Sequence, residues 1–264
     1  MDDTRIDERL QAALHRHRSL AVAVSGGVDS MTLATFAHRT RPGSIVVVHA
    51  VSPAVPAAAT SLVRSLAATE GWPLIVTEAG EFDDPRYRSN PVDRCYFCKS
   101  NLYDRIRALT PHVIASGANL DDLGDYRPGL LAAAEREVVH PYIEARMEKA
   151  AVRRLARQLD LGDIAELPAQ PCLASRIETG ISVEAEDLAF VDRMERRLGT
   201  VAPAGATIRC RVTRQGIIVE YAEVAREAVP SLQQIAAALC IEAGRQFGGI
   251  RSYRRGSMFV GSGA

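Results

Sequence analysis

The sequence predicts an α/β protein in which a doubly wound parallel sheet is followed by a small α+β region. Over the first 120 residues, short runs of Val, Ile and Ala recur without polar alternation, as in strands buried on both faces. Stretches with helical character separate these runs, and this alternation indicates βαβ units. Beyond about residue 180 the order changes to helix, two strands, helix and strand, which indicates a separate unit.

The first region alternates helices with strands. We expect helices over 5–18, 28–40, 57–70 and 100–109. We expect strands over 20–24, 44–50, 73–79 and 112–119. Ligands of such sheets bind at the carboxyl ends of the strands. Three polar segments fall at these ends or just beyond them, and they read SGGVDS, RCYFCK and SGANLDDLGDYRPG.

The second region has the pattern of a small α+β unit. Helices are expected over 183–198 and 230–244. The segments TIRCRV and GIIVEYA, around Thr213–Gly216, predict a hairpin, and a last strand is expected over 250–260. We therefore divide the chain into domains 1–179 and 180–264.

Composition and charge exclude several classes of protein. Hydrophobic residues make up 47% of the 264 residues and charged residues 24%, as in ordinary globular proteins. Acidic and basic side chains balance at 32 each, so no overall field favours nucleic acid or an anionic membrane. The N-terminal residues are charged and lack the apolar stretch of a signal peptide. We expect a cytoplasmic protein, and the odd number of five cysteines argues against a disulfide framework.

The segment SGGVDS (25–30) has the pattern of an anion-binding loop. It follows a buried strand and opens a helix, whose N-terminus supplies unpaired N–H groups and the positive end of a dipole. Two glycines allow a tight turn, and two serines add hydroxyl groups. Asp29 suits a phosphate site only if a divalent cation such as magnesium lies between the carboxylate and the phosphate. The alternative is a simple Gly-Gly turn that caps a helix.

This loop resembles the PP-loop of the N-type ATP pyrophosphatases, which cleave ATP between the α and β phosphates and adenylate their substrate. The resemblance implies an adenine nucleotide α-hydrolase-like fold with ATP and magnesium as cofactors. It also implies that the ends of the second and fourth strands flank the adenosine, near Val48–Ala50 and Gly117. The residues implied to hold pyrophosphate and magnesium are Ser25, Gly26, Gly27, Asp29 and Ser30, with Asp29 as the magnesium ligand.

The segment RCYFCK places Cys95 and Cys98 three residues apart between two basic side chains. Such a pair fits a disulfide, a zinc knuckle, a redox dithiol or ligands of an iron–sulfur cluster. Zinc would require a further ligand, for which His112 or His140 can be proposed. Cys210 and Cys240 fall in strand and helix patterns, so we expect them to be small core residues.

Four blocks in order resemble the LarE family of ATP-dependent sulfur transferases, which act in the synthesis of the nickel-pincer nucleotide cofactor. They are NPVDRCYFCKSNLY (90–103), GANLDDLGDYRPGLLAA (117–133), QPCLASRIETG (170–180) and YRRGSM (253–258). The resemblance extends from about residue 20 to 258. One departure is ETG, which stands where the family has a step similar to Pro-Tyr-Gly, and 201–216 matches loosely.

The resemblance implies that the cysteine of the CLASR block, Cys172, carries sulfur. Some members sacrifice this sulfur and are left with dehydroalanine, whereas others add a CxxC pair and assemble a [4Fe-4S] cluster. Since this chain has Cys95 and Cys98 as well, it resembles the cluster-bearing kind. Three protein thiolates leave one iron of a cubane open for an extra sulfide. A sacrificial Cys172 with incidental Cys95 and Cys98 remains the alternative.

Further polar residues are candidates for the substrate. Arg209 and Arg211 lie two apart on a predicted strand, so both side chains share a face and can clamp the phosphate of a mononucleotide. The alternative is an exposed, charged face of the strand. Arg176 follows the cysteine block and is a third candidate for binding the substrate. Asp121, Asp122 and Asp125 follow the fourth strand and serve either the ribose, the magnesium or their own loop.

The resemblance therefore predicts adenylation of a carboxylate of a pyridinium-dicarboxylate mononucleotide, release of pyrophosphate, and insertion of sulfur. Two other functions remain open. A PP-loop tRNA thiolase uses similar motifs, although the neutral charge makes a nucleic-acid partner unfavourable. A non-catalytic adenine-nucleotide sensor with a structural CxxC would bind ATP without releasing pyrophosphate. We also expect a homo-oligomer.

Overall fold

The computed structural model describes residues 3–124, 127–168, 171–254 and 258. The chain forms two compact units. The first comprises Met1–Asp84 and Asp93–Gln170, and the second comprises Pro85–Val92 and Pro171–Ala264. The chain passes to the second unit at 84/85, returns at 92/93 and passes to it again at 170/171, whereas the boundary that we drew from the sequence lies at 179/180.

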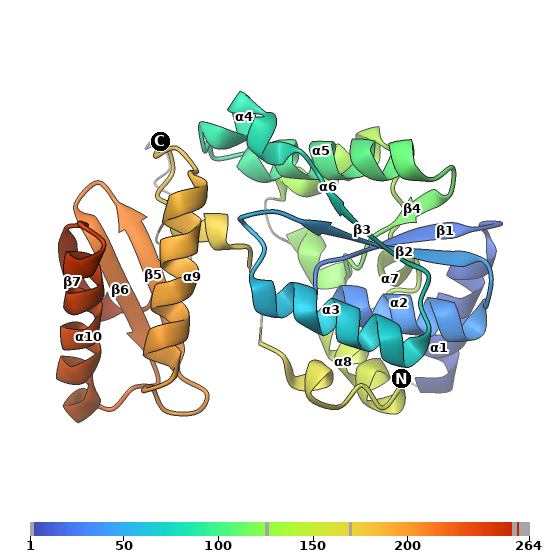
Figure 1. The fold of residues 1–264 in the computed structure, drawn as a ribbon. Helices are drawn as coiled ribbons and strands as arrows, with labels where there is room; N and C mark the ends of the chain where they lie inside the picture. Colours follow the sequence, from blue (N-terminus) through green and yellow to red (C-terminus); the bar gives the residue numbers. More distant parts are fainter. Residues whose placement is uncertain (1–2, 125–126, 169–170, 255–257, 259–264) are drawn as a thin grey trace. The chain divides into compact units, whose positions relative to one another are not determined.

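The first unit is an α/β fold built on a four-stranded parallel sheet, which confirms the predicted class (Figure 1). The sheet has the order β3-β2-β1-β4. Its strands are β1 (Leu20–Val24), β2 (Ile45–Val51), β3 (Leu74–Glu78) and β4 (Val113–Ala115). Because β2 and β4 lie on opposite sides of β1, the strand order reverses there, and the crevice between the ends of β1 and β4 is where such sheets bind ligands.

Helices cover both faces of this sheet (Figure 1). Their bounds are α1 (Asp3–His15), α2 (Val28–Thr40), α3 (Ala57–Glu70), α5 (Arg94–Leu109), α6 (Pro128–Glu135), α7 (Pro141–Glu144) and α8 (Lys149–Gln158). Leu20 and Val22 of β1 pack in one core with side chains of α2, α3 and α8. Ala21 points to the other face and packs with Tyr103 of α5 and Ala133 of α6. This alternation along β1 explains why the strand has no polar side.

The second unit contains a three-stranded sheet in the order β5-β6-β7. Its elements are α9 (Ala185–Gly199), β5 (Thr207–Thr213), β6 (Gly216–Ala222), α10 (Val229–Glu242) and β7 (Phe247–Ser252). β5 and β6 form the predicted antiparallel hairpin, and β7 adds in parallel to β6. Cys210 and Cys240 are both fully buried, which confirms that they are core residues.

The short segment 85–92, which includes α4 (Pro85–Arg88), belongs to the second unit although residues of the first unit flank it. Asn90 is fully buried and donates from its side-chain amide to the carbonyl oxygens of Glu178 and Ile181, both at 2.9 Å. Its own carbonyl accepts from Gly180, and Arg88 pairs with Glu184 at 2.7 Å. The segment is therefore fastened to 178–184 by main-chain and side-chain bonds.

Most predicted helices and strands are confirmed, but some bounds differ. β4 covers only Val113–Ala115 of the strand predicted over 112–119. α5 begins at Arg94 rather than at 100, so it includes both cysteines of the CxxC pair. The last strand is Phe247–Ser252 rather than 250–260, and part of the predicted range lies outside the described residues. The alanine-rich run LLAAAE (130–135), which has helical character in the sequence, lies in α6, whereas α7 and α8 lie where we predicted no element.

Candidate active site

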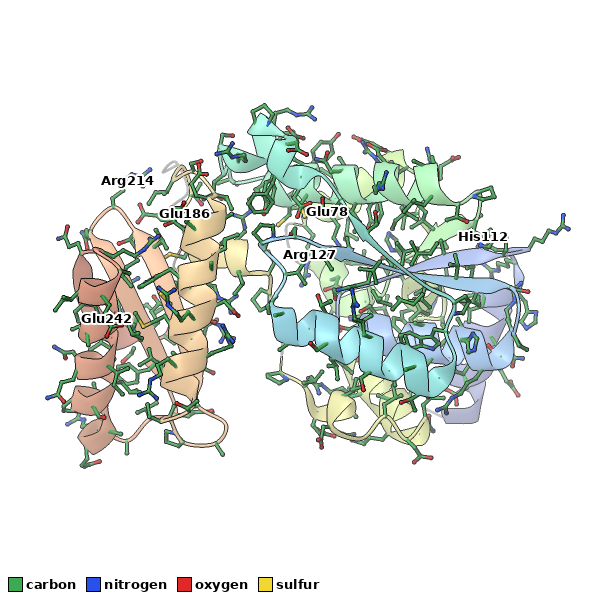
Figure 2. The ribbon with its side chains drawn as sticks, viewed as in Figure 1. Glu78, His112, Arg127, Glu186, Arg214 and Glu242 are labelled. Carbon is green, nitrogen blue, oxygen red and sulfur yellow. The ribbon has the colours of Figure 1, made fainter. Side chains whose placement is uncertain are left out.

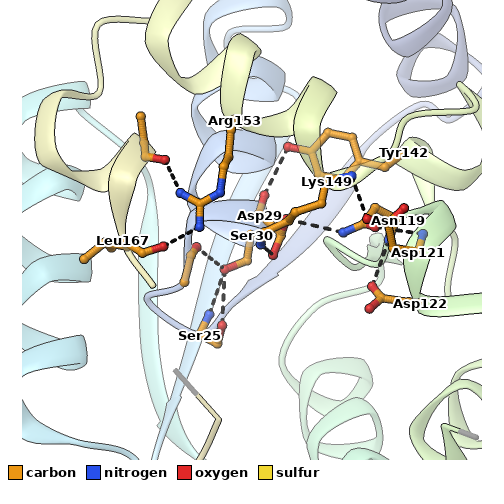
Figure 3. A network of polar contacts seen from close by, with 12 residues as sticks. Ser25, Asp29, Ser30, Asn119, Asp121, Asp122, Tyr142, Lys149, Arg153 and Leu167 are labelled. Atoms are coloured by element: carbon orange, nitrogen blue, oxygen red, sulfur yellow. Dashed lines mark hydrogen bonds and ion pairs between the residues drawn. The ribbon is translucent and has the colours of Figure 1, made fainter. Parts of the chain in front are cut away.

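The loop between β1 and α2 forms a tight turn (Figure 3). Gly26 has φ of +85°, and a Cβ atom there would lie 2.9 Å from the Cβ of Ala59 in α3. The N–H of Ser25 donates to Oγ of Ser30 at 3.1 Å, and that hydroxyl donates to the carbonyl of Gly27 at 3.2 Å. The backbone therefore turns sharply into the first turn of α2, whose N–H groups have no intrahelical partners. These residues fit an anion such as pyrophosphate.

The end of β4 approaches the same turn. A Cβ atom on Gly117 would lie 2.9 Å from the backbone nitrogen of Ser30, so only glycine fits there. On the other side of β1, Val48 is buried in the core and Ala50 is half-buried near the end of β2. The predicted roles of these residues beside the adenosine remain predictions.

Asp29 lies at the centre of a polar network in Figure 3. Its Oδ2 accepts from Nζ of Lys149, its Oδ1 accepts from the side-chain amide of Asn119 at 3.4 Å, and its carbonyl accepts from the hydroxyl of Tyr142 at 3.1 Å. Burial, and then the charge of Asp29, raise the pKa of Tyr142, so this phenol is a neutral donor. The sequence patterns did not indicate these three partners of Asp29.

The acidic side chains in the turn after β4 accept hydrogen bonds from the backbone of that turn and of the first residue of α8. Asp121 accepts from the backbone N–H of Lys149 at 3.3 Å, and Asp122 accepts from that of Asn119 at 3.0 Å. Arg127, labelled in Figure 2, pairs with Asp122 at 2.9 Å. Of the roles weighed for Asp121 and Asp122, these contacts support organisation of the loop. Asp125 lies outside the described residues.

Two histidines at this edge of the sheet are held neutral, and of these His49 is buried and His140 is half-buried. Burial lowers the pKa of His49, against the opposing effect of its bond to Val24. Its Nδ1 lies 2.9 Å from the carbonyl oxygen of Val24, so Nδ1 carries the proton and Nε2 accepts from the hydroxyl of Thr60. Burial likewise lowers the pKa of His140, whose Nδ1 lies 2.8 Å from Oγ of Ser116.

The five cysteines divide by accessibility. Cys95 and Cys172 are exposed and Cys98 is half-buried, whereas Cys210 and Cys240 are buried. Burial raises the pKa of both buried thiols, which makes them poor ligands and poor nucleophiles. Cys95 and Cys98 lie in the first turns of α5 in the first unit, and Cys172 precedes a short helical turn, Leu173–Arg176, in the second. The accessible thiols are the three that the motifs selected.

Arg176 fastens the backbone around Cys172. Its Nε and Nη2 donate to the carboxylate of Glu195 at 2.9 and 3.0 Å, and its Nη1 donates to the carbonyls of Pro171 and Cys172 at 2.8 and 3.3 Å. Only 4% of Arg176 is exposed. Burial opposes its charge, but Glu195 outweighs that effect and raises the pKa of Arg176. Through these contacts Arg176 positions the backbone at Cys172. Its predicted contact with the substrate remains a prediction.

The two arginines of β5 differ from each other. Arg211 is buried and donates to Glu220 at 2.8 Å, and Arg251 of β7 donates to the other oxygen of the same carboxylate. Arg209 is half-buried and forms no ion pair with any carboxylate in the described part of the chain; burial, then the nearby charge of Arg176, lower its pKa. Of the two arginines in the predicted phosphate clamp, Arg209 therefore has the positive charge that carboxylates compensate less.

Two kinds of feature are absent from the described residues. Within these ranges, no group of three or more His, Cys, Asp and Glu side chains lies close enough to hold a metal ion. Among the helices of those same ranges, none combines the length and the apolar character of a membrane span.

No family model matches the chain. It is 38% identical over 185 residues to the uncharacterized protein slr1717 of Synechocystis, an alignment that covers 67% of this chain and 69% of slr1717. It is 28% identical over 194 residues to the pyridinium-3,5-bisthiocarboxylic acid mononucleotide synthase of Lactiplantibacillus plantarum, over 72% and 70% of the two chains. The uncharacterized protein MJ0830 of Methanocaldococcus jannaschii is 27% identical over 124 residues, 46% of this chain and 48% of MJ0830.

Proposed function

This chain belongs to the same family as the uncharacterized protein slr1717 of Synechocystis, and we propose that it is an ATP-dependent sulfur transferase that acts on a nucleotide. The observation that carries the proposal is its distant homology, at 28% identity, to a synthase of a bisthiocarboxylic acid mononucleotide. The substrate would be a pyridinium-dicarboxylate mononucleotide, and the product would carry sulfur in place of a carboxylate oxygen.

The first step would be adenylation. A carboxylate oxygen of the substrate attacks the α phosphorus of ATP, a bond to that oxygen forms, and pyrophosphate leaves with the electrons of the broken P–O bond. The PP-loop formed by Ser25, Gly26 and Gly27 supports this step, since its backbone fits an anion of this kind. Asp29 and the hydroxyl of Ser30 are the residues that would hold magnesium against the departing phosphates.

The second step would be displacement of AMP by a sulfur nucleophile, which leaves a thiocarboxylate. Cys95, Cys98 and Cys172 support this step, because they are the accessible thiols while Cys210 and Cys240 are buried. These three thiolates are the groups that would hold a [4Fe-4S] cluster, which would supply inorganic sulfide as the nucleophile. Arg176 would fix the backbone at Cys172, and Lys99 and Arg94 would offset negative charge near the CxxC pair.

Substrate binding is assigned to the face of β5. Arg209 has the less compensated charge of the two, which a ribose phosphate would satisfy, and Arg211 would contribute its remaining donors beside it. Removal of the Arg209 charge should weaken binding of the mononucleotide and leave ATP binding unchanged. If titration of the Arg209→Met, Arg211→Met double variant shows unchanged affinity for the mononucleotide, the clamp lies elsewhere.

The decisive experiment purifies the protein without oxygen and measures iron, pyrophosphate release and the state of Cys172. A cluster predicts about four irons per chain, lost on replacement of any of the three accessible cysteines by Ala and retained in the matched Cys210→Ala variant. Release of pyrophosphate that depends on the pyridinium mononucleotide excludes a nucleotide sensor, and release that depends on tRNA favours a tRNA thiolase. Dehydroalanine at Cys172 after one turnover, seen by mass spectrometry, rejects the cluster mechanism.

A further inference from the structure

Lysine is rare in this protein. Lys99 and Lys149 are the two lysines among 32 basic Lys and Arg side chains. Lys149 is the first residue of α8, and its ammonium pairs with Oδ2 of Asp29, the carboxylate assigned to magnesium above (Figure 3). A lysine therefore occupies the position from which a cation would contact Asp29.

Hydrogen bonds hold the backbones of both residues of this pair, and both side chains are partly exposed. The backbone of Lys149 is held by Asp121, and the backbone of Asp29 is held by the hydroxyl of Tyr142. The side chain of Lys149 is 31% exposed and that of Asp29 is 27% exposed. A lysine stem is flexible, and its ammonium is a point charge that can exchange one oxygen partner for another.

The same pair obstructs a metal ion in the absence of phosphate. Magnesium requires oxygen ligands at about 2.1 Å in near-octahedral geometry. Here an ammonium contacts Oδ2 of Asp29 and an amide N–H of Asn119 points at Oδ1. A dication that binds Asp29 must displace the ammonium, and phosphate oxygens are the acceptors that can receive it.

We propose that Lys149 holds Asp29 in place of the metal when no nucleotide is bound, and transfers its ammonium to the phosphates of ATP when magnesium enters with them. The inference rests on the proposed function, because it needs a metal and a polyphosphate at the PP-loop. Its consequence is ordered loading: free magnesium alone is excluded, and the metal is admitted only with its nucleotide.

The test compares wild-type protein with Lys149→Met and with Lys149→Arg, which keeps the charge. Binding of Mn²⁺ alone to the nucleotide-free protein is titrated by electron paramagnetic resonance, and binding of magnesium pyrophosphate is titrated by calorimetry. Removal of a unit charge next to a cation site should raise the affinity of Lys149→Met for Mn²⁺ alone at least about tenfold. The same variant should bind magnesium pyrophosphate at least about tenfold more weakly, and Lys149→Arg should stay close to wild type in both titrations.

The two shifts have opposite signs, which a merely structural role would not produce. If Lys149→Met leaves Mn²⁺ binding unchanged while wild-type protein binds magnesium pyrophosphate, the exclusion role of Lys149 is wrong and the PP-loop assignment stands. If wild-type protein binds neither pyrophosphate nor ATP with magnesium, the proposed function fails and the inference fails with it. Asp29→Asn serves as the control that should lose Mn²⁺ binding in the Lys149→Met background.

Discussion

Replacement of Arg176 by Met tests whether the bonds that hold the backbone at Cys172 stabilise the second unit. The side chain is 4% exposed, and its guanidinium donates twice to Glu195 and twice to backbone carbonyls next to Cys172. Met keeps much of the apolar stem but leaves the Glu195 carboxylate, 15% exposed, without its partner. Breaking a buried ion pair by removing one partner costs about 3–5 kcal/mol of unfolding free energy. We take about 3 kcal/mol, because Glu195 keeps some solvent contact and still accepts from the N–H of Cys210.

Unfolding of the second unit can be measured separately from that of the first. Cys210 and Cys240 are buried in that unit, so their alkylation in urea, resolved by peptide mass spectrometry, reports its unfolding. With a denaturant slope of about 1.5 kcal/mol per molar, a loss of about 3 kcal/mol lowers the urea midpoint by about 2 M.

Arg209→Met is the matched control, because Arg209 forms no ion pair in the described chain and burial lowers its pKa. Its midpoint should fall by less than about 0.7 M, which corresponds to less than about 1 kcal/mol at the same slope. Equal midpoints for the two variants, or a shift below about 0.7 M for Arg176→Met, would refute this stabilisation.

Three further predictions concern the loop, the thiols and pH. Gly26→Ala should lower the unfolding free energy by about 1–2 kcal/mol, because a Cβ there is strained by its backbone conformation, whereas Gly27→Ala, with φ of −86° and its nearest contact at 3.6 Å, should cost less than about 1 kcal/mol in urea titrations. In native protein a maleimide should label the three accessible cysteines and leave Cys210 and Cys240 unlabelled; labelling of either at the rate of the accessible thiols would contradict the burial. The folded-state pKa of His49 lies below its unfolded value of about 6.5, so its stabilisation is present above about pH 6.5 and is lost as the pH falls. His49→Gln should therefore flatten the rise of unfolding free energy with pH between about 5 and 6.5, and an unchanged slope would exclude this linkage.

Local patterns were sufficient to predict the elements around the PP-loop. α2 and α3 have the predicted bounds, because each starts after a Gly or Pro turn and carries regular apolar spacing. α5 begins earlier than predicted, since its first turns, RCYFCKS, show no helical spacing of apolar residues. The cysteine pair in this segment indicated a candidate ligand or redox site, although the helix that carries the pair was not predicted.

The partners of Asp29 could not be predicted in the same way. Tyr142 and Lys149 follow Asp29 by 113 and 120 residues, and no local pattern connects positions so far apart. The one available signal was composition, because a lysine is unusual in a chain that uses arginine almost throughout. Arg176 was selected for its position after Cys172, but its pairing with Glu195 depends on where α9 packs, which the sequence does not reveal.

The segment 85–92 has a consequence for synthesis of the chain on the ribosome. Asn90 leaves the ribosome long before its partners at 178–181, which follow it by almost 90 residues. At about 5–20 residues per second, the buried side of this segment waits roughly 4–18 s for the strands and helices that cover it. A fragment that begins at 171 would lack residues 85–92 and would expose the backbone of 178–183, so the segment 171–264 is not an independent folding unit. To fold by itself, this segment would need residues 85–92 supplied in trans or joined to it by a linker.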